Sequence, residues 1–219
     1  MDNSRIHNRW PFAKEGIPFV ISCCIIIVVL SYFKLLFPSI IACAIALFVI
    51  FFFRDPNREN SAGQNAALAP ADGTILDIRH FEDGNNPLGE PAIKVSIFMS
   101  IFNVHVNRMP IDGVVKEIKY RQGKFLSANL DKASEHNENN RITIETPDSR
   151  KIVVIQIAGL IARRIACWIK ENDRVVQAQR FGLIRFGSRL EVYLPFDCEL
   201  IIEPRQKVRA GETIIGYLL

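Results

Sequence analysis

The sequence has few of the residues that hold metals and disulfides. Only five cysteines and four histidines occur among its 219 residues. Cys23, Cys24 and Cys43 fall in apolar segments, while Cys167 and Cys198 stand alone in stretches that read as strands. No CxxC pair or Cys/His cluster therefore has the spacing of a disulfide framework or a metal site. We expect buried free thiols in a reducing compartment and no bound metal.

The net charge is also small. The formal net charge is only +4, and the lysines and arginines are scattered rather than gathered in stripes with interleaved aromatic residues. This pattern disfavours a nucleic-acid partner. A mildly basic protein is better suited to an anionic lipid surface, because a negatively charged leaflet attracts such surfaces.

Between Ile17 and Phe53 charge is almost absent, since Lys34 is the only charged residue there. The runs 17–33 and 35–53 are each just under the roughly 20 residues that cross a bilayer. We predict a membrane hairpin of two apolar helices with Lys34 at its tip. A signal peptide is disfavoured, because the apolar stretch is too long and continues past Ala42-Cys43-Ala44. A hairpin that lies in one leaflet stays open as an alternative.

Basic residues flank this apolar segment. Arg5, Arg9 and Lys14 precede it, and Arg54 and Arg58 follow it. The positive-inside rule then predicts that both ends and the soluble domain lie at the cytoplasmic face of the inner membrane. The predicted layout is a basic N-terminus at 1–16, the hairpin at 17–53, a linker at 54–66 and a soluble domain at 67–219.

The soluble domain reads as mainly β within an α+β class, because short apolar runs alternate with turn residues. The stretch 125–138 reads as a loop with a helical turn or two. Residues 171–179 and 206–212 look alike, and each leads from a turn through a valine toward a strand, as in barrel-sandwich folds of lipoyl carriers. No lipoyl or biotinyl attachment motif occurs, which disfavours a carrier. The predicted strands are Gly73–His80, Ala92–Phe98, Gly113–Tyr120, Arg141–Thr146, Ile152–Ala158, Arg189–Tyr193 and Glu199–Ile202.

One dipeptide, Gly187-Ser188, has the chemistry for cutting its own backbone. A serine hydroxyl can attack the preceding carbonyl and convert the peptide bond to an ester, and β-elimination then leaves a dehydroalanine that hydrolyses to a pyruvoyl group. Glycine suits the upstream position because it lacks Cβ and tolerates strained backbone angles. By itself, a Gly-Ser pair is usually an ordinary turn.

The surrounding motifs resemble those of phosphatidylserine decarboxylases of the short class. The resemblance runs from about Phe52 to Leu219, with the motifs in the same order. The matching segments are Phe52-Phe53-Arg54-Asp55-Pro56, Ala69-Pro70-Ala71-Asp72-Gly73, Phe102-Asn103-Val104-His105-Val106-Asn107-Arg108, Ile161-Ala162-Arg163-Arg164-Ile165-Ala166-Cys167-Trp168, and Gln179 to Arg189.

This resemblance implies a self-processing enzyme. Cleavage between Gly187 and Ser188 would give a β chain of residues 1–187 and an α chain of residues 188–219, paired as a heterodimer. Residue 188 would become the pyruvoyl cofactor, which forms a Schiff base with phosphatidylserine and releases carbon dioxide and phosphatidylethanolamine. Asp72, His105 and Ser188 match the family's catalytic triad, in which the histidine takes the serine proton and the aspartate orients the imidazole.

Other interpretations of the same residues compete with this one. A lone histidine between valines is usually a satisfied core residue, and Asp72-Gly73 is a common turn before a strand. Phe102 stands where some relatives carry a second histidine, and 137–140 departs from the family's Asn-Glu-Arg pattern, which puts a headgroup-binding role for that loop in doubt. The alternative functions are a membrane-tethered zinc hydrolase and a non-enzymatic lipoyl-like carrier or adaptor.

Overall fold

The computed structural model describes all residues except 9, 128–133, 135, 161–163 and 186. The chain divides into two compact units, one formed by residues 1–6 and 58–219 and the other by residues 7–57. The helical elements are α1 (Asn3–Ile6), η1 (Lys14–Gly16), α2 (Ile17–Tyr32) and α3 (Leu36–Phe52). Arg9, one of the basic residues that precede the apolar segment, lies outside the described residues.

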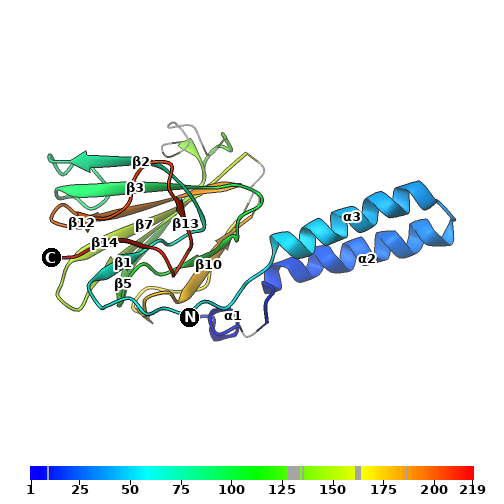
Figure 1. Cartoon of the computed structure of the whole chain (residues 1–219), viewed down its shortest axis with the longest axis horizontal. Helices are drawn as coiled ribbons and strands as arrows, with labels where there is room; N and C mark the ends of the chain where they lie inside the picture. Colours follow the sequence, from blue (N-terminus) through cyan, green and yellow to red (C-terminus); the bar gives the residue numbers. More distant parts are fainter. Residues whose placement is uncertain (9, 128–133, 135, 161–163, 186) are drawn as a thin grey trace. The chain divides into compact units, whose positions relative to one another are not determined.

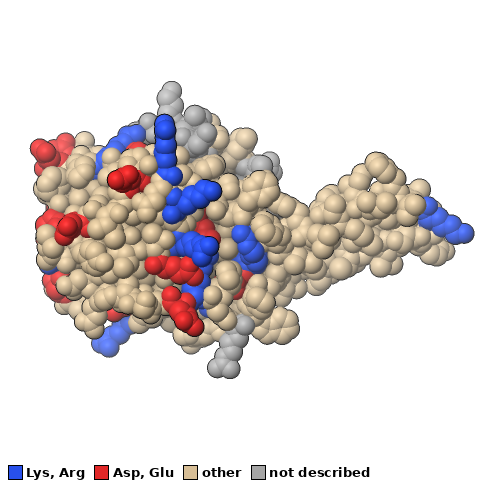
Figure 2. Space-filling view, viewed as in Figure 1, with Lys and Arg blue, Asp and Glu red and all other residues tan. Residues whose placement is uncertain are grey.

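The unit of residues 7–57 holds the apolar helices α2 and α3, which pack against each other. Lys34, in the short connection between them, has a positive φ of 54°. By length and composition, Lys14–Tyr32 is long and apolar enough to cross a membrane, and Leu36–Phe52 is a shorter apolar helix. The visible surface of these helices is almost free of charge, whereas Lys, Arg, Asp and Glu are mixed over the β-rich unit (Figure 2).

The described residues of the β-rich unit form three antiparallel sheets, and mainly β structure is confirmed. The largest sheet is curled and has the strand order β13-β2-β3-β11-β7-β6-β5-β9, with β2 beside β3 (Figure 1). The smaller sheets have the orders β1-β14-β12 and β4-β10-β8. The strands are β1 (Ala66–Leu68), β2 (Gly73–Phe81), β3 (Ala92–Met99), β4 (Val106–Arg108), β5 (Gly113–Arg121), β6 (Asn139–Glu145), β7 (Lys151–Ala158), β8 (Ile165–Cys167), β9 (Arg174–Val175), β10 (Arg180–Ile184), β11 (Ser188–Pro195), β12 (Glu199–Leu200), β13 (Lys207–Val208) and β14 (Ile214–Tyr217).

The long predicted strands agree with β2, β3, β5, β6, β7 and β11, because apolar residues alternate along them or fill them entirely. The predicted strand at 199–202 is shorter, since only Glu199 and Leu200 belong to β12. Cys198, which the sequence places within a strand, lies just before β12. Burial raises the pKa of this thiol to about 11, so it stays protonated at neutral pH. The predicted loop 125–138 lies partly outside the described residues.

The β-rich unit has an internal two-fold pattern. Residues 70–78 and 110–118, forty positions apart, share Pro, Asp, Gly and Ile at matching places. The segments before them exchange equivalent hydrogen bonds, from Leu68 N–H to the Pro110 carbonyl and from Arg108 N–H to the Pro70 carbonyl, both 2.9 Å. The two segments whose sequences look alike, 171–179 and 206–212, supply β9, which pairs with β5, and β13, which pairs with β2.

The matched aspartates at the starts of these halves play equivalent local roles. Asp72 Oδ1 accepts a hydrogen bond from Ala210 N–H at 2.8 Å, and Asp112 Oδ1 accepts one from Gln177 N–H at 2.6 Å. Each carboxylate thus fastens the loop beyond β13 or β9 to the start of a long strand. This geometry makes Asp112 a natural structural control for Asp72.

Candidate active site

Ser188 lies at the junction between a turn and the centre of the large sheet. It is the first residue of β11, fully buried, and pairs with Met99 of β3 and Ala158 of β7. Gly187 before it has a φ of +69°, a conformation that side-chain-bearing residues rarely adopt. A Cβ added at Gly187 would have only Ile101 within 4 Å, at 3.9 Å, so the glycine requirement comes from backbone angles rather than space. The peptide between the two residues therefore joins a bend, which glycine adopts at little cost, to the first residue of a central strand.

His105 lies against the backbone amide of Gly187. The Gly187 N–H points to His105 Nε2 at 3.4 Å, while Nδ1 lies 2.9 Å from the backbone carbonyl of Asn103. A carbonyl can only accept, so these contacts fit the tautomer with the proton on Nδ1. The lone pair of Nε2 then faces the Gly187-Ser188 segment from within a fully buried ring. Nε2 thus lies next to the amide of the residue that precedes Ser188.

The Ser188 hydroxyl itself is turned toward sulfur, with Oγ 3.2 Å from Met99 Sδ. Among the described residues no hydrogen bond is found between Ser188 Oγ and His105. A rotation of the serine side chain would be required before proton transfer, and such contacts often tighten only as a reaction proceeds.

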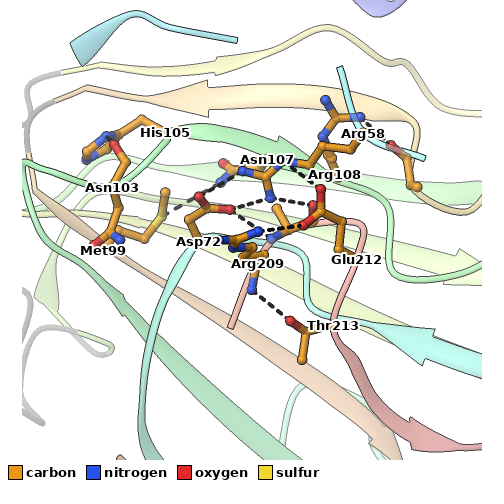
Figure 3. Close-up of polar contacts among 12 residues, drawn as sticks. Arg58, Asp72, Met99, Asn103, His105, Asn107, Arg108, Arg209, Glu212 and Thr213 are labelled. Carbon is orange, nitrogen blue, oxygen red and sulfur yellow. Dashed lines mark hydrogen bonds and ion pairs between the residues drawn. The ribbon is translucent and has the colours of Figure 1, made fainter. Parts of the chain in front are cut away.

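Asp72 is held by another partner. Arg58 grips its carboxylate bidentately, with Nη1–Oδ1 at 2.5 Å and Nη2–Oδ2 at 2.8 Å, and also donates to the Ala210 carbonyl at 2.7 Å. Figure 3 shows Asp72 grouped with Arg58, Arg209 and Glu212, whereas His105 lies apart beside Asn103. The structure thus brings His105 to Gly187, and in the part of the chain it describes no hydrogen bond joins Asp72 to His105.

Several residues near the site are not identified by sequence reasoning. Met99 contacts Ser188, and Asn107 donates toward the Met99 sulfur at 3.8 Å. Gln156 donates to Asn107 at 2.8 Å, and Asn140 donates to Gln156 at 2.9 Å. This row of buried amides continues away from Ser188 under β6 and β7. The sequence feature that could have identified them is a polar residue within an apolar strand, such as Gln156 among isoleucines and valines.

The segment 137–140 has a structural role here. Asn137 donates to the carbonyls of Leu126 and Ala158, each at 2.8 Å, and Ala158 is the β7 partner of Ser188. Asn140 belongs to the buried amide row. Two of the four residues that depart from the expected family pattern therefore fasten the loop to the strand beside the cleavage site. The motif residues Phe186 and 161–163 lie outside the described residues.

Among the described residues no group of three or more His, Cys, Asp or Glu side chains could hold a metal ion. The five cysteines are free thiols.

The chain matches known proteins over nearly its whole length. Residues 45–216 match the family model for phosphatidylserine decarboxylase. Three relatives carry the name phosphatidylserine decarboxylase proenzyme. The protein of Syntrophus aciditrophicus is 48% identical over 206 residues, covering 93% of this chain and 96% of its own. That of Geobacter metallireducens is 45% identical over 217 residues, covering 97% and 99%. That of Geotalea uraniireducens is 45% identical over 208 residues, covering 95% and 97%. This chain therefore belongs to the phosphatidylserine decarboxylase family of carboxy-lyases.

Proposed function

We propose that this protein decarboxylates phosphatidylserine to phosphatidylethanolamine with a pyruvoyl group that it makes by cutting itself at Gly187-Ser188. The observation that carries the proposal is the contact of His105 Nε2 with the Gly187 amide, directly before a buried serine at the start of a central strand. The site fits the group, because a ketone at residue 188 would be held rigidly by β3 and β7 on either side.

The proposed cut uses residues of the chain alone. Ser188 Oγ turns from Met99 and attacks the Gly187 carbonyl carbon as His105 Nε2 takes its proton. The peptide C–N bond breaks, an ester C–O bond forms, and the proton passes to the freed nitrogen. A base removes the Cα proton of residue 188, the Cβ–Oγ bond breaks, and the Gly187 carboxylate leaves to give dehydroalanine. The imine tautomer of dehydroalanine then adds water and loses ammonia, which leaves the pyruvoyl group. That group supplies an electron sink for the electrons released when the substrate carboxylate departs.

The two fragments would stay together as one folded unit. The α chain, residues 188–219, contains β11 to β14. Its β11 bonds to β3 and β7, its β13 to β2 and its β14 to β1, all of which belong to the β chain. Breaking one peptide bond at the start of β11 removes none of these strand pairings. We propose that the matched halves around β2 and β5 make this unit a barrel-sandwich related to lipoyl domains.

A comparison with Asp112 tests the proposed role of Asp72 in self-cleavage. Direct contact with His105 requires that the Asp72 carboxylate leave Arg58. If Asp72 then stabilises the imidazolium, Asp72→Asn slows cleavage about a hundredfold or more. Asp112→Asn removes the equivalent carboxylate from the other half, and it should cut at the wild-type rate. The measurement is the half-time of precursor disappearance on denaturing gels.

Thermal melting of both variants separates chemistry from folding. Equal cleavage rates for the two asparagine variants would show that Asp72 serves only its ion pair with Arg58. The Asn103 carbonyl would then be sufficient to orient His105.

The reaction itself is tested by reductive trapping. Sodium cyanoborohydride with phosphatidylserine should attach the lipid amine to the α chain alone, at residue 188. Carboxyl-labelled lipid should release labelled carbon dioxide in the presence of a metal chelator and without added pyridoxal phosphate. A zinc hydrolase would lose activity to the chelator, and a carrier would release no carbon dioxide. A fully cleaved, membrane-reconstituted preparation that releases none would refute the decarboxylase assignment.

We also propose that α2 and α3 form the membrane hairpin at the cytoplasmic face, where the substrate headgroup would be accessible. A chain that starts at Arg54 lacks both helices and should shift from the membrane to the soluble fraction on centrifugation. Any part that stays bound through basic surface residues should be released by high salt. Protease added outside intact cells should leave the β-rich unit undigested; its digestion would reverse the orientation.

A further inference from the structure

A cavity of about 910 Å³ lies on the face of the large sheet opposite the Ser188 side chain. Along β11, Ser188 and Leu190 point to one face, so Arg189, Glu191 and Tyr193 point to the other. The pairing of β11 with β3 and β7 shows no register shift along this stretch. Arg189, Glu191 and Tyr193 all line the cavity, whereas Ser188 and Met99 do not. The cavity is therefore separate from the cleavage site.

The cavity wall is strongly cationic. Glu191 is the one acidic residue among the described lining residues. Asp77 lies beside the wall and Glu117 pairs with Lys119. Glu138 bonds to Tyr120 of the wall, so among the described residues six cations less four acids leave an excess of two positive charges. The six cations are Arg79, Lys94, Lys119, Arg121, Arg141 and Arg189.

The Arg189 guanidinium has an N–H group that no described residue accepts from. Its side chain is 1% exposed, and Nη2 donates to Ser96 Oγ at 2.9 Å and reaches Asp77 at 3.3 Å. Its Nε lies 3.1 Å from Glu191. Nη1, however, is buried without a hydrogen-bond partner among the residues that the structure describes. A buried charged donor without an acceptor is costly, so such a group indicates a missing acceptor.

Arg141 supplies a second guanidinium from β6. Its Nη2 donates to the Pro87 carbonyl, while its buried Nε has no partner within the described part of the chain. In the sheet, Arg141 is paired with Ile155, which is paired with Glu191, and Arg189 stands two residues before Glu191 on the same face. Two strand spacings separate β6 from β11, roughly 10 Å. Long arginine side chains from both strands can converge on one small anion in this gap.

The acidic residue of the wall is already engaged. Glu191 Oε1 accepts from Ser134 Oγ at 2.7 Å and lies 3.7 Å from Lys94 Nζ, and Oε2 accepts from the Tyr193 hydroxyl at 3.3 Å. Burial, followed by the charge of Glu191, raises the pKa of Tyr193 well above its ordinary value, so this hydroxyl remains a donor at neutral pH. Glu191 thus positions the cations, and its negative charge is offset by Arg189 and Lys94.

We propose that this cavity binds a phosphoryl group, carried either by an anionic phospholipid headgroup or by a free phosphate ester. A phosphate monoester, such as the headgroup of phosphatidic acid, offers three non-bridging acceptor oxygens, which match two guanidinium forks and Lys94 better than the two oxygens of a carboxylate. Apolar residues complete the wall, namely Phe81, Pro87 and Ile155, and they suit the organic part of such a ligand.

Titration calorimetry of the full-length protein in a non-ionic detergent tests the site. Inorganic phosphate is the soluble probe, and phosphatidylcholine vesicles with and without phosphatidic acid are the lipid probe. We expect saturable binding of one phosphoryl group per chain to at least one probe. Arg141→Gln should weaken it about tenfold, the loss of one charge-assisted hydrogen bond. Lys207→Gln, which removes an exposed cation of β13 outside the cavity, should leave it unchanged.

The outcomes distinguish a free phosphate from a lipid headgroup and include the results that would overturn the proposal. Arg141-dependent binding of inorganic phosphate identifies a free phosphate, and Arg141-dependent binding of phosphatidic acid vesicles alone identifies a lipid headgroup. Absence of binding to both probes, or equal weakening by Arg141→Gln and Lys207→Gln, would overturn the proposal. Arg141→Lys keeps the charge without the fork and should weaken binding several-fold, which provides a second variant if Arg141→Gln unfolds. The uncut Ser188→Ala chain should bind the phosphoryl probe as tightly as the wild-type chain. Binding at this cavity therefore does not depend on the proposed decarboxylation, and failure of either proposal can be recognised separately.

Discussion

Ser188→Ala is expected to leave a single intact chain of 219 residues that releases no carbon dioxide. Without Oγ nothing attacks the Gly187 carbonyl, so neither the cut nor the pyruvoyl group can form. The folded precursor should survive, because the change removes the contact of Oγ with Met99 and leaves the backbone pairing of β11 in place. Such a loss costs about 1 kcal/mol of unfolding free energy. The measurement is the intact mass under denaturing conditions. The wild-type protein should show fragments 1–187 and 188–219.

Ser96→Ala is the matched control for this variant. Ser96 is as fully buried as Ser188 and lies in the neighbouring strand β3, but its hydroxyl accepts from Arg189 on the cavity face. It should therefore be cut normally. The α chain of the wild-type protein should also have a blocked, amine-free start. A Ser188→Ala chain that still splits at the same bond would show that the serine is not the nucleophile.

His105→Gln is expected to accumulate uncut precursor, with cleavage slowed about 10²- to 10⁴-fold, the usual contribution of a positioned general base. Glutamine keeps a polar side chain beside Asn103 and Gly187 but offers no basic nitrogen. The half-time of cleavage after synthesis measures the effect. The expected loss is smaller than for Ser188→Ala, because a slow cut without a base remains chemically accessible.

His80→Gln serves as its control. His80 is exposed and packs edge-on against Phe196, with ring centroids 5.8 Å apart, so its loss should not change cleavage. The melting temperature of His105→Gln needs to stay near that of the wild type for the result to report on chemistry. A well-folded His105→Gln chain that cuts at the normal rate would remove His105 from the mechanism.

Much of the fold follows from local patterns. The charge-free run at 17–53 predicts apolar helices, since only Lys34 interrupts it, and the structure places α2 and α3 there. Runs of apolar residues between turn residues predict the long strands. The short strands β9 and β13 are harder to predict, because two residues carry no periodicity. They form only because the long strands β5 and β2 offer them an edge.

The residues of the candidate site were likewise predictable only in part. The sequence alone determined that Gly187-Ser188 is the bond to examine, because the dipeptide chemistry and the family motifs are both local. It also pointed to His105, and the structure places that ring against Gly187. That Arg58 holds the Asp72 carboxylate was decided only by the tertiary structure.

The physical reason is that a side chain's partner depends on which strands are neighbours and in what register. Alternation along a strand tells which residues share a face, but it does not tell which distant strand lies opposite. Arg189 and Arg141 line one cavity because β7 lies between β11 and β6 in an unbroken register. Ser188, one residue before Arg189, faces the other side of the same sheet. The sequence alone determined the bond proposed to break, whereas the long-range pairing of strands decided what surrounds it.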